Sequence, residues 1–345
     1  MPAELQPGAV DCDVHVAPAT FAALEPYLSD YWRQYIAESS VRLIDMSYAY
    51  PPAAGPKAPR SYDELRERYL DVAEPEAVVL NCLTGFETYR NPYFSAAVAT
   101  AVNEWLREEF LARDPRLRAS LSVSTVAPED AVAEIERAGA DPGFVSLLLP
   151  VRSDVPWAHR THHPMLAAAA ERGLTVGLHA WGRGGKATTP SGFTTTWLEN
   201  YLANQPIAQA QLLAFVSEGV FERHPDLKVL ISECGFAWLP TLLWRFDKDW
   251  KGVWREVPWV KEEPSKYVAE HFLFTTAPAH LPTDTEQLDQ LLEMLGGSEM
   301  LVYASDFPHE HGAGIESLLA RLDDPAREAL LRGSATELFG LGAAA

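Results

Sequence analysis

The sequence is poor in cysteine and has no long apolar run. Only three of its 345 residues are cysteines, Cys12, Cys82 and Cys234, too few and too scattered for a disulfide framework or a cysteine-rich zinc site. Such isolated thiols suit a reducing compartment, and no secretion signal is recognisable, so we expect a cytoplasmic protein. No apolar run approaches the roughly 20 residues that a membrane-spanning helix needs, which argues against a membrane protein.

Positive charge is also scarce. The chain has 28 Lys and Arg against 48 Asp and Glu, a net charge of −20. This balance argues against nucleic acid and anionic membranes as partners. The glycine-rich stretch at 182–185 lacks the GxGxxG spacing of a dinucleotide-binding turn. With 47% hydrophobic and 22% charged residues, the composition is that of a soluble globular protein, and we expect its partner to be a small molecule.

What the sequence does contain is eight short apolar runs, rich in β-branched residues, with helical patterns between them. The runs are 8–15, 76–83, 119–124, 143–149, 174–179, 227–233, 272–276 and 300–306. The helical patterns are 93–111, 128–139, 163–172, 196–220 with a break near Pro206, 237–250, 284–296 and 325–332. This alternation predicts an α/β fold, a parallel (β/α)8 TIM barrel. No linker divides the chain, so we expect residues 1–345 to form a single domain.

Two long insertions follow predicted strands. Residues 16–75 come after the first run and residues 180–196 after the fifth. The active sites of TIM barrels lie at the carboxyl ends of the strands, so both insertions are placed to shape a substrate site. A third insertion, residues 251–271, precedes the seventh run and belongs to the opposite face of the barrel.

The first run ends in acid-x-acid-x-His, namely Asp11, Asp13 and His15. Side chains alternate along a strand, so all three are predicted to face one side. Buried polar groups without partners cost roughly 2–7 kcal/mol each, and a divalent metal ion is a common partner for such a set. Asp13 and His15 lie nearer the carboxyl end of the strand, so they are the better ligand candidates. Asp11 is better explained as a supporting acid than as a third ligand.

Three other runs end in a polar residue of the same kind: His179, Glu233 and Asp306. Because the carboxyl ends of the strands meet at one mouth of a barrel, these side chains should converge with Asp13 and His15. Nitrogen and oxygen ligands of this kind suit zinc, manganese or iron(II). We expect one divalent metal ion, with zinc first and manganese or iron as alternatives.

These motifs resemble those of the amidohydrolase superfamily, in its amidohydrolase-related (amidohydrolase 2) branch. That branch includes aminocarboxymuconate semialdehyde decarboxylase, resorcylate-type decarboxylases and hydrolases of lactones. The resemblance rests on residues 11–15, 177–179, 221–240, 304–309 and 332–339. It implies a metal-dependent TIM-barrel enzyme, often a homodimer. Its implied metal ligands are Asp13, His15, His179 and Asp306, and it implies that Asp306 also handles a proton.

The main departure from the family pattern is Glu233. Relatives often carry His at this position in a His-x-Gly run, whereas this chain reads Glu233-Cys234-Gly235. Glu233 is therefore a candidate catalytic acid or base, an orienting group for a metal-bound water, or a support for His179. No lysine lies between Val145 and Leu149 to bridge two metals, which favours a single ion.

Four further residues are candidate substrate contacts. Arg183 and Trp181 follow His179, Arg90 follows the second run, and His309 lies in the Asp-Phe-Pro-His motif after the eighth. Cations in a glycine-rich loop suit a carboxylate, and aromatic side chains suit a flat ring. These residues are also compatible with solvated loops and ordinary packing.

The function that these features favour is non-oxidative decarboxylation (a lyase reaction) of a small aromatic or unsaturated carboxylic acid, with Asp306 or Glu233 delivering a proton to carbon. One alternative is a metal-dependent hydrolase of a lactone, amide or ester, in which a metal-bound water is the nucleophile. A second alternative is a ligand-binding barrel without catalysis. The substrate itself cannot be decoded from the loops.

Overall fold

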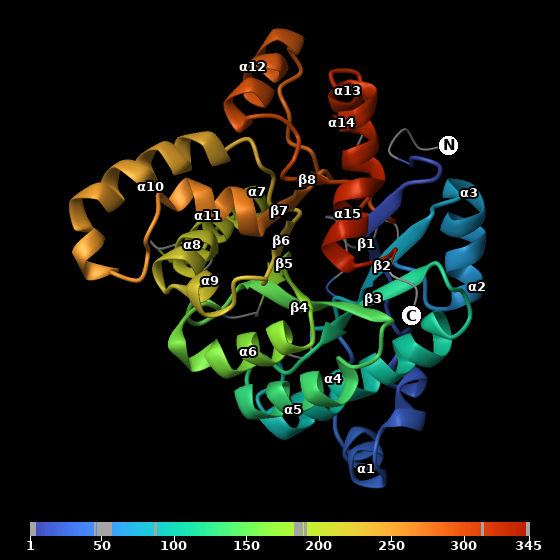
Figure 1. The fold of residues 1–345 in the computed structure, drawn as a ribbon. Coiled ribbons are helices and arrows are strands. Elements are labelled where there is room, and N and C mark those ends of the chain that lie inside the picture. Colours follow the sequence, from blue (N-terminus) through green and yellow to red (C-terminus); the bar gives the residue numbers. More distant parts are fainter. Residues whose placement is uncertain are drawn as a thin grey trace.

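The computed structural model describes residues 5–44, 46, 57–85, 88–182, 189, 192–311 and 314–342. Its eight strands form one sheet in sequence order, with every neighbouring pair parallel. The strands are β1 (Val10–His15), β2 (Ala77–Asn81), β3 (Leu117–Ser122), β4 (Phe144–Arg152), β5 (Thr175–Gly182), β6 (Val229–Ser232), β7 (Phe272–Thr275) and β8 (Leu301–Val302). A parallel bridge from Val14 to Phe307 joins β1 to the segment after β8. The predicted (β/α)8 barrel is confirmed, and Figure 1 shows the helices around it.

The predicted helices between the strands are present. They are α4 (Pro92–Leu106, continued by a π-helix at Arg107–Leu111), α5 (Pro128–Ala138), α6 (His163–Glu171), α7 (Trp197–Leu202), α8 (Asn204–Ser217), α9 (Val220–Arg223), α10 (Leu239–Val253), α12 (Thr285–Leu295) and α14 (Asp324–Glu328, continued by a π-helix at Ala329–Gly333). The long 196–220 segment breaks at Ala203 rather than at Pro206. Pro206 lies in the first turn of α8, where backbone N–H groups have no helical partner to lose.

Other helices lie outside the seven helical patterns. They are α1 (Asp30–Glu38), α2 (Tyr62–Leu65, continued by a π-helix at Arg66–Leu70), α3 (Asp71–Ala73), α11 (Pro264–His271), α13 (Gly314–Leu319) and α15 (Ser334–Phe339, the closing helix implied by the family). The first three belong to the 16–75 insertion and α11 to the 251–271 insertion. Among the described residues, no helix combines the length and apolarity needed to span a bilayer. A single domain over 1–345 stays a prediction.

The interior of the barrel is filled at its amino-terminal end. Val10, Cys12, Val79, Val145, Leu230 and Val302 form a small inner core, closed from below by Ala335 and Phe339 of α15. A larger core lies between the sheet and the outer helices. Apolar side chains therefore fill the barrel at the amino-terminal ends of the strands, and the polar side chains lie at the carboxyl ends.

A buried amide fixes α4 and α5 to the end of β3. The Asn103 side chain donates to Ser122 O at 2.8 Å and to Glu134 Oε1 at 2.7 Å, and its oxygen accepts from Ser122 N at 2.9 Å. Asn103 is fully buried. Asn103→Leu would leave buried polar groups without partners, at about 1–3 kcal/mol each. We expect it to lower the free energy of unfolding by about 3 kcal/mol.

Urea unfolding followed by tryptophan fluorescence measures this loss. The matched control is Gln290→Leu on the exposed surface of α12, which should shift the free energy of unfolding by less than about 0.5 kcal/mol. Equal effects of the two variants would show that the Asn103 network does not stabilise the barrel.

Candidate metal centre

A β-bulge in β1 decides which of its polar side chains enter the barrel. Val10 and Asp11 pair with Ala77 and Val78, but the register then shifts before Val14 pairs with Leu80. Two residues of β1, Cys12 and Asp13, thus stand opposite one residue of β2, which is the definition of a bulge. Cys12 packs in the inner core, and Asp13 also faces inward, where it meets His179.

The prediction that Asp11 shares a face with Asp13 and His15 is therefore wrong. Asp11 accepts hydrogen bonds from the Tyr69 hydroxyl at 2.5 Å, from Ser305 N at 3.0 Å and from Asp13 N at 3.1 Å. Simple alternation failed because the extra residue of the bulge reverses the side-chain order. Burial raises the pKa of Asp11 to about 6, against the opposing effect of its hydrogen bonds. Asp11 supports the turn after β8 and the bulge, as a structural acid would.

The other five predicted polar groups meet at the carboxyl ends of their strands. His15 Nε2 lies 2.7 Å from Asp306 Oδ1 and 3.1 Å from Glu233 Oε1. His179 Nε2 lies 3.1 Å from Asp13 Oδ2 and 3.5 Å from Glu233 Oε1. One ligand atom from each of Asp13, His15, His179 and Glu233 lies within 4.8 Å of all the others, and the same holds for His15, Glu233, Asp306 and His309.

This donor set fits a divalent cation. Nitrogen and oxygen ligands bind zinc at about 2.0–2.2 Å, so ligand atoms around one ion lie roughly 3–4 Å apart. The distances from the imidazole nitrogens to the carboxylate oxygens fall close to this range. Three carboxylates buried so near one another also need compensating positive charge, because an isolated buried charge is costly.

Two of these acids have strained backbones. Glu233 has φ +59° and Asp306 has φ +55°, both in the left-handed region that non-glycine residues rarely occupy. Glu233 directly follows β6, whereas Asp306 lies four residues after the end of β8. The Glu233 N–H donates to Thr275 Oγ1 at 3.2 Å. Strain of this kind costs of order 1–3 kcal/mol per residue and is concentrated at functional sites. The two turns direct both carboxylates toward the cluster.

Asp306 is surrounded by imidazoles. Besides His15, His309 Nδ1 lies 2.8 Å from Oδ1 and His311 Nε2 lies 2.5 Å from Oδ2. Burial alone would raise the pKa of Asp306, but hydrogen bonds from these three histidines outweigh burial and hold the pKa well below its usual range. Asp306 therefore remains a carboxylate at neutral pH.

The charges of the remaining groups depend on one another. Burial raises the pKa of Glu233, and the negative charge of Asp306 raises it further. Burial would lower the pKa of His15 and His179, but the charge of Asp13 and the other carboxylates raises both. Burial opposes ionisation of Asp13, yet the charges of His179 and His15 lower its pKa. A cation binding at these nitrogens would displace protons, as metal binding to histidines generally does.

The cluster lies at the base of a cavity of about 740 Å³. Its polar lining includes Glu233, Asp306, His309 and His311, with His280, Glu310, Asn204 and Gln205. Its large apolar lining residues are Met46, Leu83, Trp197, Leu198, Tyr201 and Leu202. A volume between 300 and 1,000 Å³ with apolar walls and a few polar groups is typical of small-molecule sites. The site can therefore hold an organic molecule with one polar end.

Comparison with known proteins agrees with this geometry. A family model described as Amidohydrolase matches residues 10–341. The chain belongs to the amidohydrolase family. The gamma-resorcylate decarboxylase of Rhodococcus jostii (strain RHA1) is 26% identical over 290 residues, covering 72% of this chain and 81% of that protein.

Two solved structures share the fold of this amidohydrolase. The dihydroxybenzoic acid decarboxylase of Polaromonas sp. JS666, with bound manganese and the inhibitor 2-nitroresorcinol, gives a TM-score of 0.69 at 19% identity, covering 98% of both chains. An amidohydrolase from Mycobacterium avium subsp. paratuberculosis K-10 gives a TM-score of 0.73 at 18% identity, covering 97% of this chain and 98% of that one. The family and fold predicted from the motifs are confirmed.

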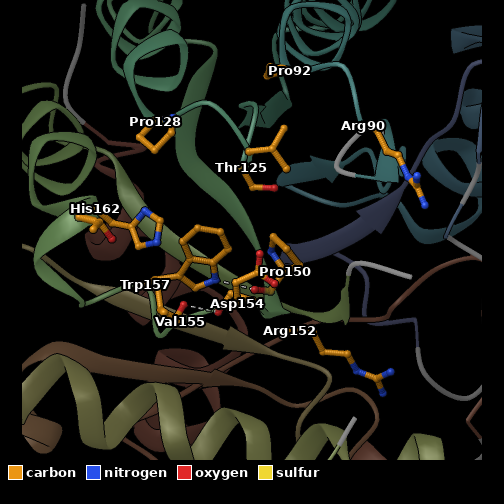
Figure 2. Close-up of a pocket in the computed structure, with 13 residues that line it drawn as sticks. Arg90, Pro92, Thr125, Pro128, Pro150, Arg152, Asp154, Val155, Trp157 and His162 are labelled. Atoms are coloured by element: carbon orange, nitrogen blue, oxygen red, sulfur yellow. Dashed lines mark hydrogen bonds between the residues drawn. The ribbon is translucent and has the colours of Figure 1, made fainter. Parts of the chain in front are cut away.

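The predicted substrate contacts of this amidohydrolase are not all brought together. His309 reaches Asp306, as above. Trp181 is buried with its ring centroid 5.5 Å from that of His179. Arg183 lies outside the described residues. Arg90 is exposed and lines a second pocket of about 380 Å³ beside Arg152 and Trp157, rather than the cavity above the cluster (Figure 2).

His311 was not among the candidates predicted from the sequence. Its imidazole contacts the same carboxylate as His309, although it lies two residues further along a segment with no regular structure. The signal was present in the run Asp306-Phe-Pro-His-Glu-His311, where two histidines follow an acid closely. Only the turn geometry shows that both rings fold back onto it.

Proposed function

We propose that this amidohydrolase is a metal-dependent, non-oxidative decarboxylase of an aromatic acid with a hydroxyl group next to the carboxyl group. The observation that carries the proposal is the buried cluster of two imidazoles and three carboxylates at the base of an apolar-walled cavity. The similarity to the gamma-resorcylate decarboxylase of Rhodococcus jostii supports this substrate class. So does the similar fold of the dihydroxybenzoic acid decarboxylase of Polaromonas, which holds a resorcinol inhibitor.

Asp13, His15, His179 and Asp306 would hold the ion, with Glu233 beside them. From the sequence we expected zinc first. The two carboxylates among these four ligands suit manganese, and the Polaromonas enzyme carries manganese, so we propose Mn²⁺ ahead of Zn²⁺. When bound, the ion supplies positive charge that orients the carboxylate and hydroxyl oxygens of the substrate and stabilises developing negative charge.

Glu233 is the group that we assign to proton transfer. Its side chain keeps 16% exposure at the cavity, whereas that of Asp306 keeps only 2% and is bonded to three imidazoles. In the reaction the ring-to-carboxyl C–C bond breaks and its electron pair stays on the ring carbon. That carbon takes the proton from Glu233, carbon dioxide leaves, and solvent returns a proton to Glu233. The apolar walls exclude water from the ring.

The test is product analysis with defined metal content. Protein stripped with a chelator is reloaded with Mn²⁺ or Zn²⁺ and mixed with 2,6-dihydroxybenzoate. We expect carbon dioxide and resorcinol in equal amounts, only after reloading, and faster with Mn²⁺. Benzoate, which lacks the hydroxyl groups, should give no gas.

Two other results would replace the proposal. Ring opening of an aryl lactone with gain of one water, and no gas from any acid, would assign the alternative hydrolase function. Binding of these acids without any turnover would assign the ligand-binding alternative.

We also propose a cytoplasmic homodimer, on the basis of the family resemblance and the three buried free thiols. Light scattering of the purified protein measures the oligomeric state.

A further inference from the structure

The cavity above the cluster has both polar and apolar lining residues. Glu233, Asp306 and His309 of the cluster line it, as do the polar residues Asn204, Gln205, His280, Glu310 and His311. Helix α7 contributes four large side chains to the lining, Trp197, Leu198, Tyr201 and Leu202. These large side chains are exposed, Leu198 to 71% and Tyr201 to 46%. An apolar cluster left exposed at the mouth of a site marks a surface that binds an apolar group.

Helix α7, which carries these four side chains, has only 6 residues. A capping box between Thr196 and Glu199 starts α7. Trp197 and Tyr201 are one turn apart, and their ring centroids lie 5.9 Å apart. Leu198 and Leu202 are related by the same spacing. The four side chains therefore form a continuous apolar surface along the helix, which we call the α7 wall.

Hydrogen bonds from Arg152 hold the α7 wall in place. Arg152, at the end of β4, donates to Asn200 O at 2.8 Å, to Asn200 Oδ1 at 2.9 Å and to Asn204 Oδ1 at 2.7 Å. Figure 2 shows Arg152 extending from the strand end. Because these bonds tie α7 and the start of α8 to the barrel, the wall keeps a set position relative to the cluster. A preorganised wall loses less entropy when a ligand binds.

The size of the cavity exceeds the needs of a single ring. An apolar cavity of about 150 Å³ accommodates benzene, and a carboxylated dihydroxy ring is only moderately larger. The present cavity has about 740 Å³. With the carboxyl and hydroxyl groups at the cluster, the ring position opposite the carboxyl group points away from the cluster. The remaining volume is bounded in part by the α7 wall, which lines the same cavity.

We propose that the substrate carries an apolar chain of several carbons at the ring position opposite the carboxyl group, seated against the α7 wall. This inference rests on the proposed function, since that function sets which end of the molecule meets the cluster. It selects 4-alkyl-2,6-dihydroxybenzoates over the unsubstituted acid. The products of their decarboxylation are 5-alkylresorcinols.

The first experiment measures binding without turnover. Calorimetric titration of the Mn²⁺-loaded protein with resorcinol, 5-propylresorcinol and 5-pentylresorcinol gives Kd along the series. Each buried methylene raises affinity roughly three- to fourfold, so we expect at least about 30-fold tighter binding of the pentyl compound. Leu198→Ala combined with Tyr201→Ala should reduce this gain to less than about fivefold. Tyr93 is an exposed aromatic residue on α4 that does not line the cavity, so Tyr93→Ala should leave the gain unchanged.

The second experiment measures decarboxylation of 2,6-dihydroxybenzoate and its 4-pentyl derivative. We expect a matching rise in kcat/KM with the alkyl chain, and the double variant should lose this rise. Turnover of the parent acid with no preference for the chain in either experiment would overturn the inference and leave the proposed function intact. A chain preference in binding that the double variant abolishes, without decarboxylation of any acid, would keep the α7 site and reject the decarboxylase.

The α7 wall has one other possible occupant, a second copy of the chain. If the double variant changes the oligomeric state measured by light scattering and the wild type shows no chain preference, the wall is a subunit interface. That result would overturn the inference.

Discussion

Replacing Asp13 with Asn is expected to abolish stable metal binding and the proposed activity together. Asp13 is fully buried and lies against His179, and Asn81 Nδ2 donates to its Oδ1 at 2.8 Å. The amide keeps the size of the side chain but removes the negative charge that a cation requires. Loss of groups that only support metal ligands costs 10–100-fold in affinity, so loss of a ligand should cost at least about 100-fold. Elemental analysis after gel filtration, with kcat/KM under Mn²⁺, measures both effects.

Asp11→Asn is the matched control, because it makes the same chemical change two residues away. Asp11 faces Tyr69 and Ser305 outside the cluster, and an amide oxygen can still accept from Ser305 N and Asp13 N. We expect nearly full metal content and activity within about tenfold of wild type. If Asp11→Asn loses the metal and Asp13→Asn retains it, Asp11 rather than Asp13 is the ligand. The bulge would then not determine which acid binds the metal.

Replacing Glu233 with Gln is expected to lower kcat by about 10²–10⁴ while the protein keeps its metal. The amide cannot deliver a proton to the ring carbon, but it retains the shape of the side chain at the cavity. All four proposed ligands remain, namely Asp13, His15, His179 and Asp306. Steady-state kinetics with 2,6-dihydroxybenzoate measures the fall in kcat. Metal analysis of the same sample shows whether the ion is retained.

Glu233→His provides the control for this second prediction, since relatives often carry His at the corresponding position. Histidine tolerates the left-handed backbone found at Glu233 better than most residues, so the turn should survive. Because histidine can also donate a proton, Glu233→His should recover part of the activity that is lost in Glu233→Gln. If instead the Gln variant loses its metal along with its activity, Glu233 is a ligand and the proton must come from another group.

Much of the architecture could be predicted because it depends on local patterns. Eight apolar runs alternating with helical segments predicted the barrel, and each run overlaps an observed strand. The convergence of His15, His179, Glu233 and Asp306 followed from topology alone, since parallel strands in a barrel end at one mouth. Errors of a few residues remained at the ends, as at β8, where the run 300–306 supplies only Leu301–Val302.

The barrel, its family and the strand ends that carry the polar groups could thus be predicted, because periodicity and strand order express these directly. The bulge that turns Asp11 away from Asp13 could not be predicted, since a bulge depends on pairing with β2. Only the tertiary structure placed Arg90 in a separate pocket, brought His311 onto Asp306 and tied α7 to Arg152. Each of these depends on loop geometry and on contacts between residues distant in sequence, which have no periodic signature in the chain.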